Sequence, residues 1–379
     1  MRRDFKKLLL IFCIAGVAIA AAERAHVIAL LPVASAMPRP QAANANDVLR
    51  QFAAINPVDV HIHAFKSDPE IANLMARLRL HVMDICVADR HGIYADLPTE
   101  VARAKGFVES SGGHAKLCVT FSPFEFREKD FAQNTIKQLR KDFAGGAIAV
   151  KIWKNIGMEL TRPDGTYVMP DDPVFHPIYK AIQEENKTLI AHVAEPSSCW
   201  QPPNPDSPDY EYYEQNPQWY MYLHPDHPRK EAILAARDHL LAQNPKLRVV
   251  GAHLGSMETD VDEIAKRFDR YPNFAVDTAA RMEYLMIQPR DKVRNFLIKY
   301  SDRVLYGTDL EFLAGESTVE ALNDWQGTYA RDWKFLATDQ MLEYHGRQIK
   351  GLNLPPPVLQ RIFHDNAAHW IPGIVDTPE

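Results

Sequence analysis

The sequence predicts an α/β protein built as a (β/α)8 TIM barrel. Eight short apolar segments alternate with amphipathic segments of helical period between about residues 55 and 371. Strands that alternate with helices pair in parallel, because each parallel connection needs a crossover, and eight such repeats can close a barrel. No glycine-rich phosphate loop follows the first strand, so an open doubly wound sheet is the less favoured alternative.

Each expected strand is a short run rich in Val, Ile and Leu, and each expected helix has apolar residues at a period near 3.6. The strands are expected at residues 57–63, 81–87, 115–121, 147–153, 188–193, 247–253, 273–277 and 303–308. The helices between them are expected at residues 69–78, 99–110, 131–143, 174–185, 230–242, 261–268 and 291–300. A last helix is expected from residue 356 to about residue 370.

The N-terminus has the pattern of an export signal. Basic residues precede an uncharged run of 15 residues at 8–22, which is short for a membrane span and typical of a signal-peptide core. We expect a signal peptide at residues 1–36, cleaved after about residue 20–22 or after residue 36. The pair Arg2-Arg3 fits the twin-arginine route, and an ordinary secretory signal explains it equally well.

This signal predicts an exported protein, in the bacterial periplasm. Charged residues follow the apolar run at once, so no stable membrane anchor is expected after cleavage. Residues 37–54 are rich in Ala, Asn and Pro and are expected to be a lead-in segment. Residues 55–371 would form the barrel domain, and residues 372–379 a C-terminal tail.

The composition is that of a globular protein, with 46% hydrophobic and 24% charged residues. A net charge of -6 gives no reason to expect nucleic acid as a partner. The cysteines beyond the signal are Cys86, Cys118 and Cys199, without a Cys-x-x-Cys pair, so we expect core residues and no disulfide framework.

Two connections are much longer than usual. Residues 194–228 contain eight prolines and many aromatic residues. Residues 310–354 include an expected helix at about 318–335. Both follow the C-terminal ends of expected strands, which form the catalytic face of a barrel. We therefore expect these connections, after strands five and eight, to be lids or walls of a pocket.

Several expected strands end in one ionisable residue. His61 and His63 lie two residues apart on the first strand, so both point to one face, and Val58, Val60 and Ile62 are expected on the opposite, apolar face. A buried strand carries a polar residue only when that residue is satisfied or functional.

Three further strands continue this pattern. Strands five, six and eight end in His192, His253 and Asp309, and strand four carries Lys151. A hydrogen-bonded core residue is the simpler interpretation for any one histidine. The whole set favours a divalent metal site, because imidazole and carboxylate groups are common metal ligands.

The motifs around these residues resemble a known family. The phrases are Val-Asp-Val-His-Ile-His at 58–63, Gly-Ala-His-Leu-Gly at 251–255 and Leu-Tyr-Gly-Thr-Asp at 305–309. They are similar to the amidohydrolase superfamily, and to its amidohydrolase-2 branch, which includes the aminocarboxymuconate-semialdehyde decarboxylase-like enzymes. The ending at 362–368 resembles the closing Asn-Ala helix of that branch. The resemblance covers roughly residues 55–371 and also implies the (β/α)8 fold.

The resemblance implies roles for these residues. His61, His63 and His192 would bind one divalent metal, with zinc expected, and Asp309 would be a further ligand. Asp309 would also take a proton from the attacking water. His253 would act as an acid and base or hydrogen-bond the substrate. Such a metal lowers the pKa of water and polarises a carbonyl group.

Lys151 has three interpretations. In the first, Lys151 is carbamylated and bridges two metals, as in some members of the superfamily. In the second, it is a cation that holds a substrate carboxylate. In the third, it is structural and pairs with a carboxylate in the barrel mouth. Lys154, Arg281 and Trp200 are further candidates for substrate contact. Arg281 holds a carboxylate well because it can donate two parallel hydrogen bonds. It would instead be a structural brace if it paired with a nearby acid such as Asp277 or Glu311.

The sequence therefore predicts a metal-dependent hydrolase that acts on an amide, ester or lactone of a small, carboxylated molecule. The alternative on the same site is a non-oxidative decarboxylase or a hydratase. A non-catalytic periplasmic binding protein is less favoured, because no expected ligand is missing. The expected partner is a small-molecule substrate, and a homo-oligomer stays open.

Overall fold

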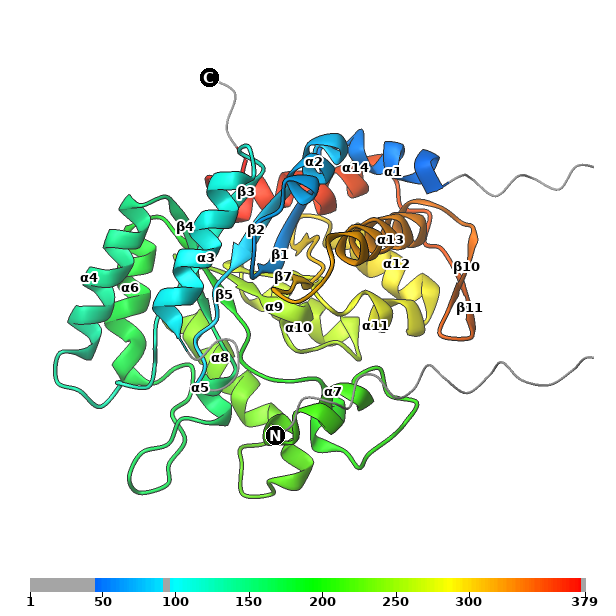
Figure 1. Cartoon of the computed structure of the whole chain (residues 1–379). Helices are drawn as coiled ribbons and strands as arrows, with labels where there is room; N and C mark the ends of the chain where they lie inside the picture. The colour runs from blue at the N-terminus through cyan, green and yellow to red at the C-terminus, as the bar shows by residue number, and fades with distance from the viewer. Residues whose placement is uncertain (1–44, 91–95, 376–379) are drawn as a thin grey trace, which may run out of the picture. The chain divides into compact units, whose positions relative to one another are not determined.

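The structure is a computed structural model that describes residues 45–90 and 96–375, so the expected signal peptide lies outside the described residues. Nine parallel strands form one sheet at the centre, and the helices pack around it (Figure 1). The strands are β1 (Val58–Ala64), β2 (His81–Ile85), β3 (Ala115–Thr120), β4 (Ala147–Ile152), β5 (Thr188–Ala191), β6 (Arg248–Gly251), β7 (Phe274–Asp277), β8 (Val304–Leu305) and β9 (Leu310–Phe312).

The sheet closes into a barrel. Its order is β8-β7-β6-β5-β4-β3-β2-β1-β9, and β9 follows β8 directly in the chain, so these two strands are halves of one interrupted eighth strand. The residues between β8 and β9 also bond to β1: the Val60 N–H donates to the Tyr306 carbonyl at 3.0 Å, and the Asp309 N–H donates to the His61 carbonyl at 2.8 Å. The eighth strand thus pairs with the first along its length, which confirms the predicted (β/α)8 barrel.

The helices confirm most of the expected pattern. They are α1 (Ala45–Ala53), α2 (Pro69–Leu78), α3 (Leu97–Ser110), α4 (Phe131–Ala144), α5 (Asn155–Met158), α6 (His176–Glu184), α7 (Tyr210–Gln215), α8 (Lys230–Gln243), α9 (Ala252–Gly255), α10 (Val261–Arg270), α11 (Met282–Ile287), α12 (Arg290–Lys299), α13 (Thr318–Ala337), α14 (Pro356–Gln360) and α15 (Asn366–Trp370). The expected last helix is divided into α14, a π-helical turn at Arg361–Asp365 and α15.

The first strand departs from simple alternation. The pairing register between β1 and β2 shifts between Asp59 and Ile62, which is a β-bulge or equivalent irregularity. Val58 and Val60 pack in the barrel interior with β-strand residues and with α15, whereas Ile62 packs in the larger core under the helices. The expectation that Val58, Val60 and Ile62 share one face was therefore wrong. The bulge changes the phase of the strand, so that both histidines reach the barrel mouth although Val60 also points inward.

The lead-in segment contains more structure than its composition indicates. Its second half forms α1, and Phe52 on this helix is fully buried. The Phe52 ring stacks on Tyr329 of α13 at 5.1 Å between centroids and meets Phe363 edge-on at 5.7 Å. Tertiary packing of this aromatic face stabilises a helix that is too short to be stable alone.

The two long connections have different positions. The first carries α7 and short 3-10 turns, and its residues reach the mouth of the barrel. The second carries the expected helix, observed as α13, and an unexpected hairpin of β10 (Met341–Tyr344) and β11 (Arg347–Lys350). α13 packs against α1 and α2 on the outside of the barrel, away from its mouth (Figure 1).

Across residues 45–90 and 96–375, no helix has the length and apolar character needed to cross a membrane. Cys86, Cys118 and Cys199 are buried and free, as expected for core residues.

Candidate metal-binding site

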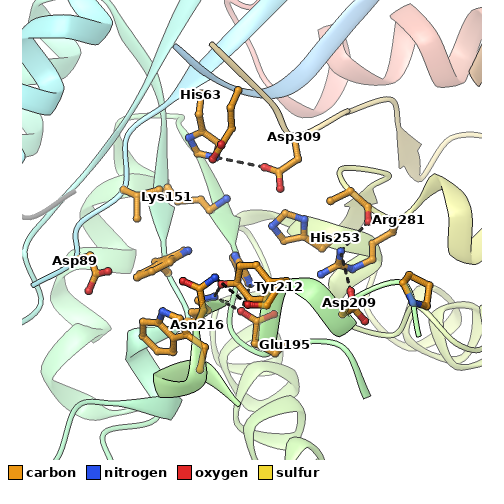
Figure 2. Close-up of a pocket in the computed structure, with 18 of the residues that line it drawn as sticks. His63, Asp89, Lys151, Glu195, Asp209, Tyr212, Asn216, His253, Arg281 and Asp309 are labelled. Atoms are coloured by element: carbon orange, nitrogen blue, oxygen red, sulfur yellow. Dashed lines mark hydrogen bonds and ion pairs between the residues drawn. The ribbon is translucent and has the colours of Figure 1, made fainter. Parts of the chain in front are cut away.

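A cavity of about 750 Å³ opens at the C-terminal ends of the strands. Its lining includes expected residues from six strand ends or the loops after them, and Figure 2 shows several of them around one space. These expected residues are His63, Lys151, Lys154, His192, His253, Arg281 and Asp309. The first long connection forms one wall, with Asp209, Tyr212 and Trp219 among its lining residues, while the second reaches the cavity at Glu311.

Two histidines and a carboxylate converge on one point. The Oδ1 atom of Asp309 lies 3.3 Å from Nε2 of His61 and 3.4 Å from Nε2 of His63. These three atoms are close enough to bind one metal ion together. The arrangement joins the first strand to the interruption in the eighth, which only a closed barrel brings side by side.

The other ring nitrogen of each histidine is fixed by a hydrogen bond. His63 Nδ1 lies 2.7 Å from the Ile85 carbonyl and His253 Nδ1 lies 2.9 Å from the Ala279 carbonyl. Because a carbonyl oxygen only accepts, each Nδ1 carries a hydrogen, so Nε2 is the nitrogen that has the lone pair when the ring is neutral. This is the usual arrangement around metal-binding histidines.

Asp277 supports two of these residues from the end of β7. Its Oδ2 atom lies 2.9 Å from His61 Nδ1, and its Oδ1 atom accepts the His253 backbone N–H at 2.7 Å. The second bond holds His253 in a left-handed backbone conformation with φ of 58°. His61, His253 and Asp277 form a second group with metal-binding geometry, but the hydrogen bonds of Asp277 explain this closeness without an ion.

His192 provides a direct test of whether a metal fits. Its side chain is buried, and its Nε2 atom has no hydrogen-bond partner among the described residues. The nearest carboxylate oxygen, on Glu195, lies 4.0 Å away, beyond hydrogen-bonding distance. An unpaired buried nitrogen is costly, and a metal ion in the cavity would satisfy it. The residues present therefore fit a divalent metal.

The protonation states suit metal binding. Burial holds the pKa of His192 and of His253 well below its usual value. Burial and the Lys151 ammonium lower the pKa of His61, although Asp277 and Asp309 oppose this. Burial would raise the pKa of Asp309, but the neighbouring histidines outweigh it and hold that pKa well below its usual range. The site thus offers neutral imidazoles at His61, His192 and His253 and an ionised carboxylate at Asp309.

His63 differs from the other histidines. Burial lowers its pKa, but the hydrogen bond and charge of Asp309 outweigh burial, so the pKa is raised. This effect depends on the same carboxylate that would share a metal with His63.

Lys151 is buried at the centre of the site. Its Nζ atom lies 2.9 Å from His61 Nε2, and its backbone carbonyl accepts the Thr120 hydroxyl at 2.8 Å. Burial lowers its pKa. Among the described residues, no carboxylate lies within ion-pair distance of its Nζ atom, so the structure gives no support to a structural pairing with Asp or Glu.

Lys154 is neutralised by the protein itself. Its ammonium forms a buried ion pair with Glu195 and donates to the Tyr212 hydroxyl at 2.5 Å. The ammonium also lies over the rings of Trp153 and Trp219, at 4.9 and 4.6 Å from their centroids. Trp200 does not line the cavity; its indole N–H donates to the Pro228 carbonyl at 3.0 Å.

Arg281 lines the cavity with donors to spare. The side chain is 8% exposed, its Nη1 atom donates to the Ala280 carbonyl at 2.7 Å, and its buried Nε atom has no partner among the described residues. Its nearest acid is Asp209 at 4.0 Å, not Asp277 or Glu311. Asp209 itself accepts the Ser198 hydroxyl at 2.6 Å and the hydroxyl of Tyr284.

Some site residues were not assigned these roles from sequence. Asp277 ends a buried strand, which is the signal that found His192 and Asp309, and the sequence predicts for it a place in the wider pocket or a pairing with Arg281, not the support of His61 and His253. Glu195 and Asp209 lie in an irregular connection, where no periodic pattern distinguishes a pocket residue from a solvated one.

A comparison with protein-family models gives a match over much of the chain. A family model described as Amidohydrolase matches residues 130–372. No curated protein matches the sequence.

Solved structures give distant similarities. An uncharacterised TIM-barrel protein from Bordetella bronchiseptica has 15% identity and a TM-score of 0.48, covering 84% of this chain and 99% of that chain. A 2,6-dihydroxybenzoate decarboxylase from Rhizobium has 13% identity and a TM-score of 0.45, and the match covers 83% of this chain and 98% of that chain. A putative 2-pyrone-4,6-dicarboxylic acid hydrolase from Pseudomonas putida has 12% identity and a TM-score of 0.47, and the match covers 84% of this chain and 98% of that chain.

The family model spans most of the barrel and includes strand ends five, six and eight, with His192, His253 and Asp309. Members of this family are metal-dependent enzymes, and candidate ligands for a metal are present in this structure. The chain belongs to the amidohydrolase-2 family.

Proposed function

We propose that this protein is a zinc-dependent hydrolase that cleaves an amide, ester or lactone bond in a small molecule. One observation carries the proposal: Asp309 Oδ1 lies within 3.4 Å of Nε2 of both His61 and His63, and the unpaired Nε2 of His192 belongs to the same cavity lining. Three imidazoles and one carboxylate are ligands that suit zinc and leave room for water and substrate.

Each of these residues has its own role in the proposed reaction. His61, His63 and His192 would hold the metal, with Asp309 beside them. When bound, the metal supplies Lewis acidity, which lowers the pKa of water and polarises a substrate carbonyl. Asp309, which is ionised, accepts the proton of the attacking water. His253 presents the lone pair of Nε2, since Nδ1–H is held by the Ala279 carbonyl. Nε2 takes the water's proton from Asp309 and passes it to the leaving group.

Arg281 supports a carboxylated substrate. A buried guanidinium with an unused Nε donor lowers the cost of bringing an anion into the cavity, and its planar donors match a carboxylate. The loop after β7 also places Arg281 next to His253, because the Ala279 and Ala280 carbonyls accept from these two side chains in turn. A carboxylate held there would orient the rest of the substrate toward the metal site.

Lys151 favours a second candidate function, a decarboxylase. Its ammonium lies 2.9 Å from His61 Nε2 and has no carboxylate partner among the described residues. A cation at this point could instead hold the carboxylate that leaves as carbon dioxide. The same metal site would then polarise a substrate oxygen, and no water would attack.

A turnover screen in ¹⁸O-labelled water distinguishes these functions. The screen uses lactones, N-acyl compounds and aromatic carboxylates, with carbon dioxide detection. A hydrolase places one solvent oxygen in the product, and we expect Asp309→Asn to lower kcat at least about 100-fold while the protein stays folded. Release of carbon dioxide without solvent oxygen would replace the hydrolase by the decarboxylase. Full activity of Asp309→Asn would contradict both.

A further inference from the structure

Asp59 is a buried acid that the proposed chemistry does not use. It lies on β1, two residues before His61, and is fully buried. Its neighbours Val58 and Val60 point into the barrel, so its own side chain points outward, toward Tyr329 of α13. No lysine or arginine lies within ion-pair distance of this carboxylate in residues 45–90 and 96–375. Hydrogen bonds alone therefore stabilise it.

Four donors surround the Asp59 carboxylate. Its Oδ1 atom accepts the backbone N–H groups of His61 and Thr308, at 3.1 and 3.0 Å. Its Oδ2 atom accepts the Thr308 hydroxyl at 2.6 Å and the Tyr329 hydroxyl at 3.1 Å. Backbone N–H groups cannot reverse their role, so Oδ1 is an acceptor.

These bonds fix the backbone on both sides of Asp309. The Thr308 hydroxyl, held by Asp59, also accepts the Leu310 N–H at 3.1 Å. Asp309 between them has φ of 66°, a left-handed conformation that costs a non-glycine residue about 1–2 kcal/mol. Its own N–H donates to the His61 carbonyl at 2.8 Å. Such strain persists only where surrounding contacts determine the conformation, and Asp59 accepts two of these hydrogen bonds and holds the hydroxyl that accepts a third.

We propose that Asp59 is a positioning residue that holds Asp309 in the conformation needed to bind the metal. One carboxylate contacts the backbone of His61 and of Thr308, so it sets the spacing between the two strands that carry the ligands. The Tyr329 bond extends this support to α13, a helix that contributes nothing to the cavity lining. This inference rests on the proposed metal site.

Two tyrosine variants separate positioning from general stability. Tyr329 and Tyr306 each donate a buried hydrogen bond to an aspartate, at 3.1 Å to Asp59 and at 3.0 Å to Asp332 of α13. Tyr329→Phe and Tyr306→Phe should lower the free energy of unfolding by similar amounts, because each removes one buried hydrogen bond. Only Tyr329→Phe removes a bond to Asp59, so Tyr306→Phe is its matched control.

The measurement is the zinc dissociation constant, obtained by competition with a chromophoric chelator. We expect about 10–100-fold weaker zinc binding for Asp59→Asn, a smaller loss for Tyr329→Phe, and an unchanged constant for Tyr306→Phe. Denaturant unfolding of each zinc-free variant reports stability separately.

Equal zinc affinities for the two tyrosine variants and the wild type would overturn the proposal, as would equal losses in both. If Asp59→Asn does not fold, the comparison of the tyrosine variants decides alone. A wild-type protein that binds no zinc would instead remove the proposed function, so the two failures are distinguishable.

Discussion

Burial of single acids shapes both the site and its stability. Asp84 on β2 accepts the Ala64 N–H at 2.9 Å through Oδ1, while its buried Oδ2 atom has no partner among the described residues. Burial raises its pKa to about 7, against the smaller opposing effect of that hydrogen bond. An aspartate in an unfolded chain titrates near ~3.9.

The sign of the pH effect follows from these two values. Between pH ~3.9 and about 7 the folded protein binds more protons at Asp84 than the unfolded chain does, so the free energy of unfolding falls as the pH rises. Each pH unit in this window costs about 1.4 kcal/mol for one such group. We expect Asp84→Asn to reduce this fall and to be more stable than the wild type at pH 8.

Denaturant unfolding at pH 5 and pH 8 measures this difference. Asp324→Asn, an exposed site on α13, is the control for loss of one acid. A wild type and an Asp84→Asn variant with parallel stability from pH 5 to pH 8 would show that Asp84 stays ionised in the fold.

Prediction of single residues from the sequence succeeded where an ionisable residue stands in an otherwise apolar strand. His63, Lys151, His192, His253 and Asp309 each interrupt an apolar strand end, and the structure brings all of them to one cavity. Asp209 and Glu195 do not lie in apolar strands. Asp209 lies near Arg281 and Glu195 lies near Lys154 because of the path of a long connection. No local pattern encodes that path.

At the scale of elements, α1 shows how packing overrides composition. The segment rich in Ala and Asn was expected to be a lead-in, but Phe52 is buried against α13 and the C-terminal helical turn. We expect Phe52→Ala to lower the free energy of unfolding by about 3–5 kcal/mol, because a large aromatic side chain leaves a cavity.

Denaturant unfolding also measures this effect, with Val319→Ala on α13 as the control. Val319 is 67% exposed, so its truncation should change stability by no more than about 0.5 kcal/mol. A loss below about 1 kcal/mol for Phe52→Ala would show that α1 is dispensable to the barrel.

The elements themselves were predictable because periodicity is strong in this chain, as α2 at Pro69–Leu78 illustrates. The interruption between β8 and β9, at residues 306–309, and the bulge in β1 were not, because each is a short stretch of irregular backbone with no periodic signal. The interruption depends on the left-handed Asp309 and on the contacts of Asp59, which are distant in sequence. Long-range contacts of this kind leave no trace in local pattern.

At the scale of the whole molecule, fold and site depend on each other. Strand eight returns beside strand one only when the barrel closes, and this closure brings Asp309 to His61 and His63. The sequence could predict the closed barrel from eight repeats, and the resemblance to the amidohydrolase-2 family then implied which strand-end residues bind the metal. The order of strands thus explains why ligands separated by almost 250 positions meet.

Elemental analysis of the purified, folded protein tests the metal site most directly. We expect about one divalent metal ion per chain in the wild type, and the same content in Arg281→Met, which changes the cavity but no proposed ligand. Two ions per chain would support a bridging role for Lys151. Loss of most of the metal in His61→Ala and Asp309→Ala is the predicted result. A wild type that is active without metal, or full metal content in both ligand variants, would contradict the account.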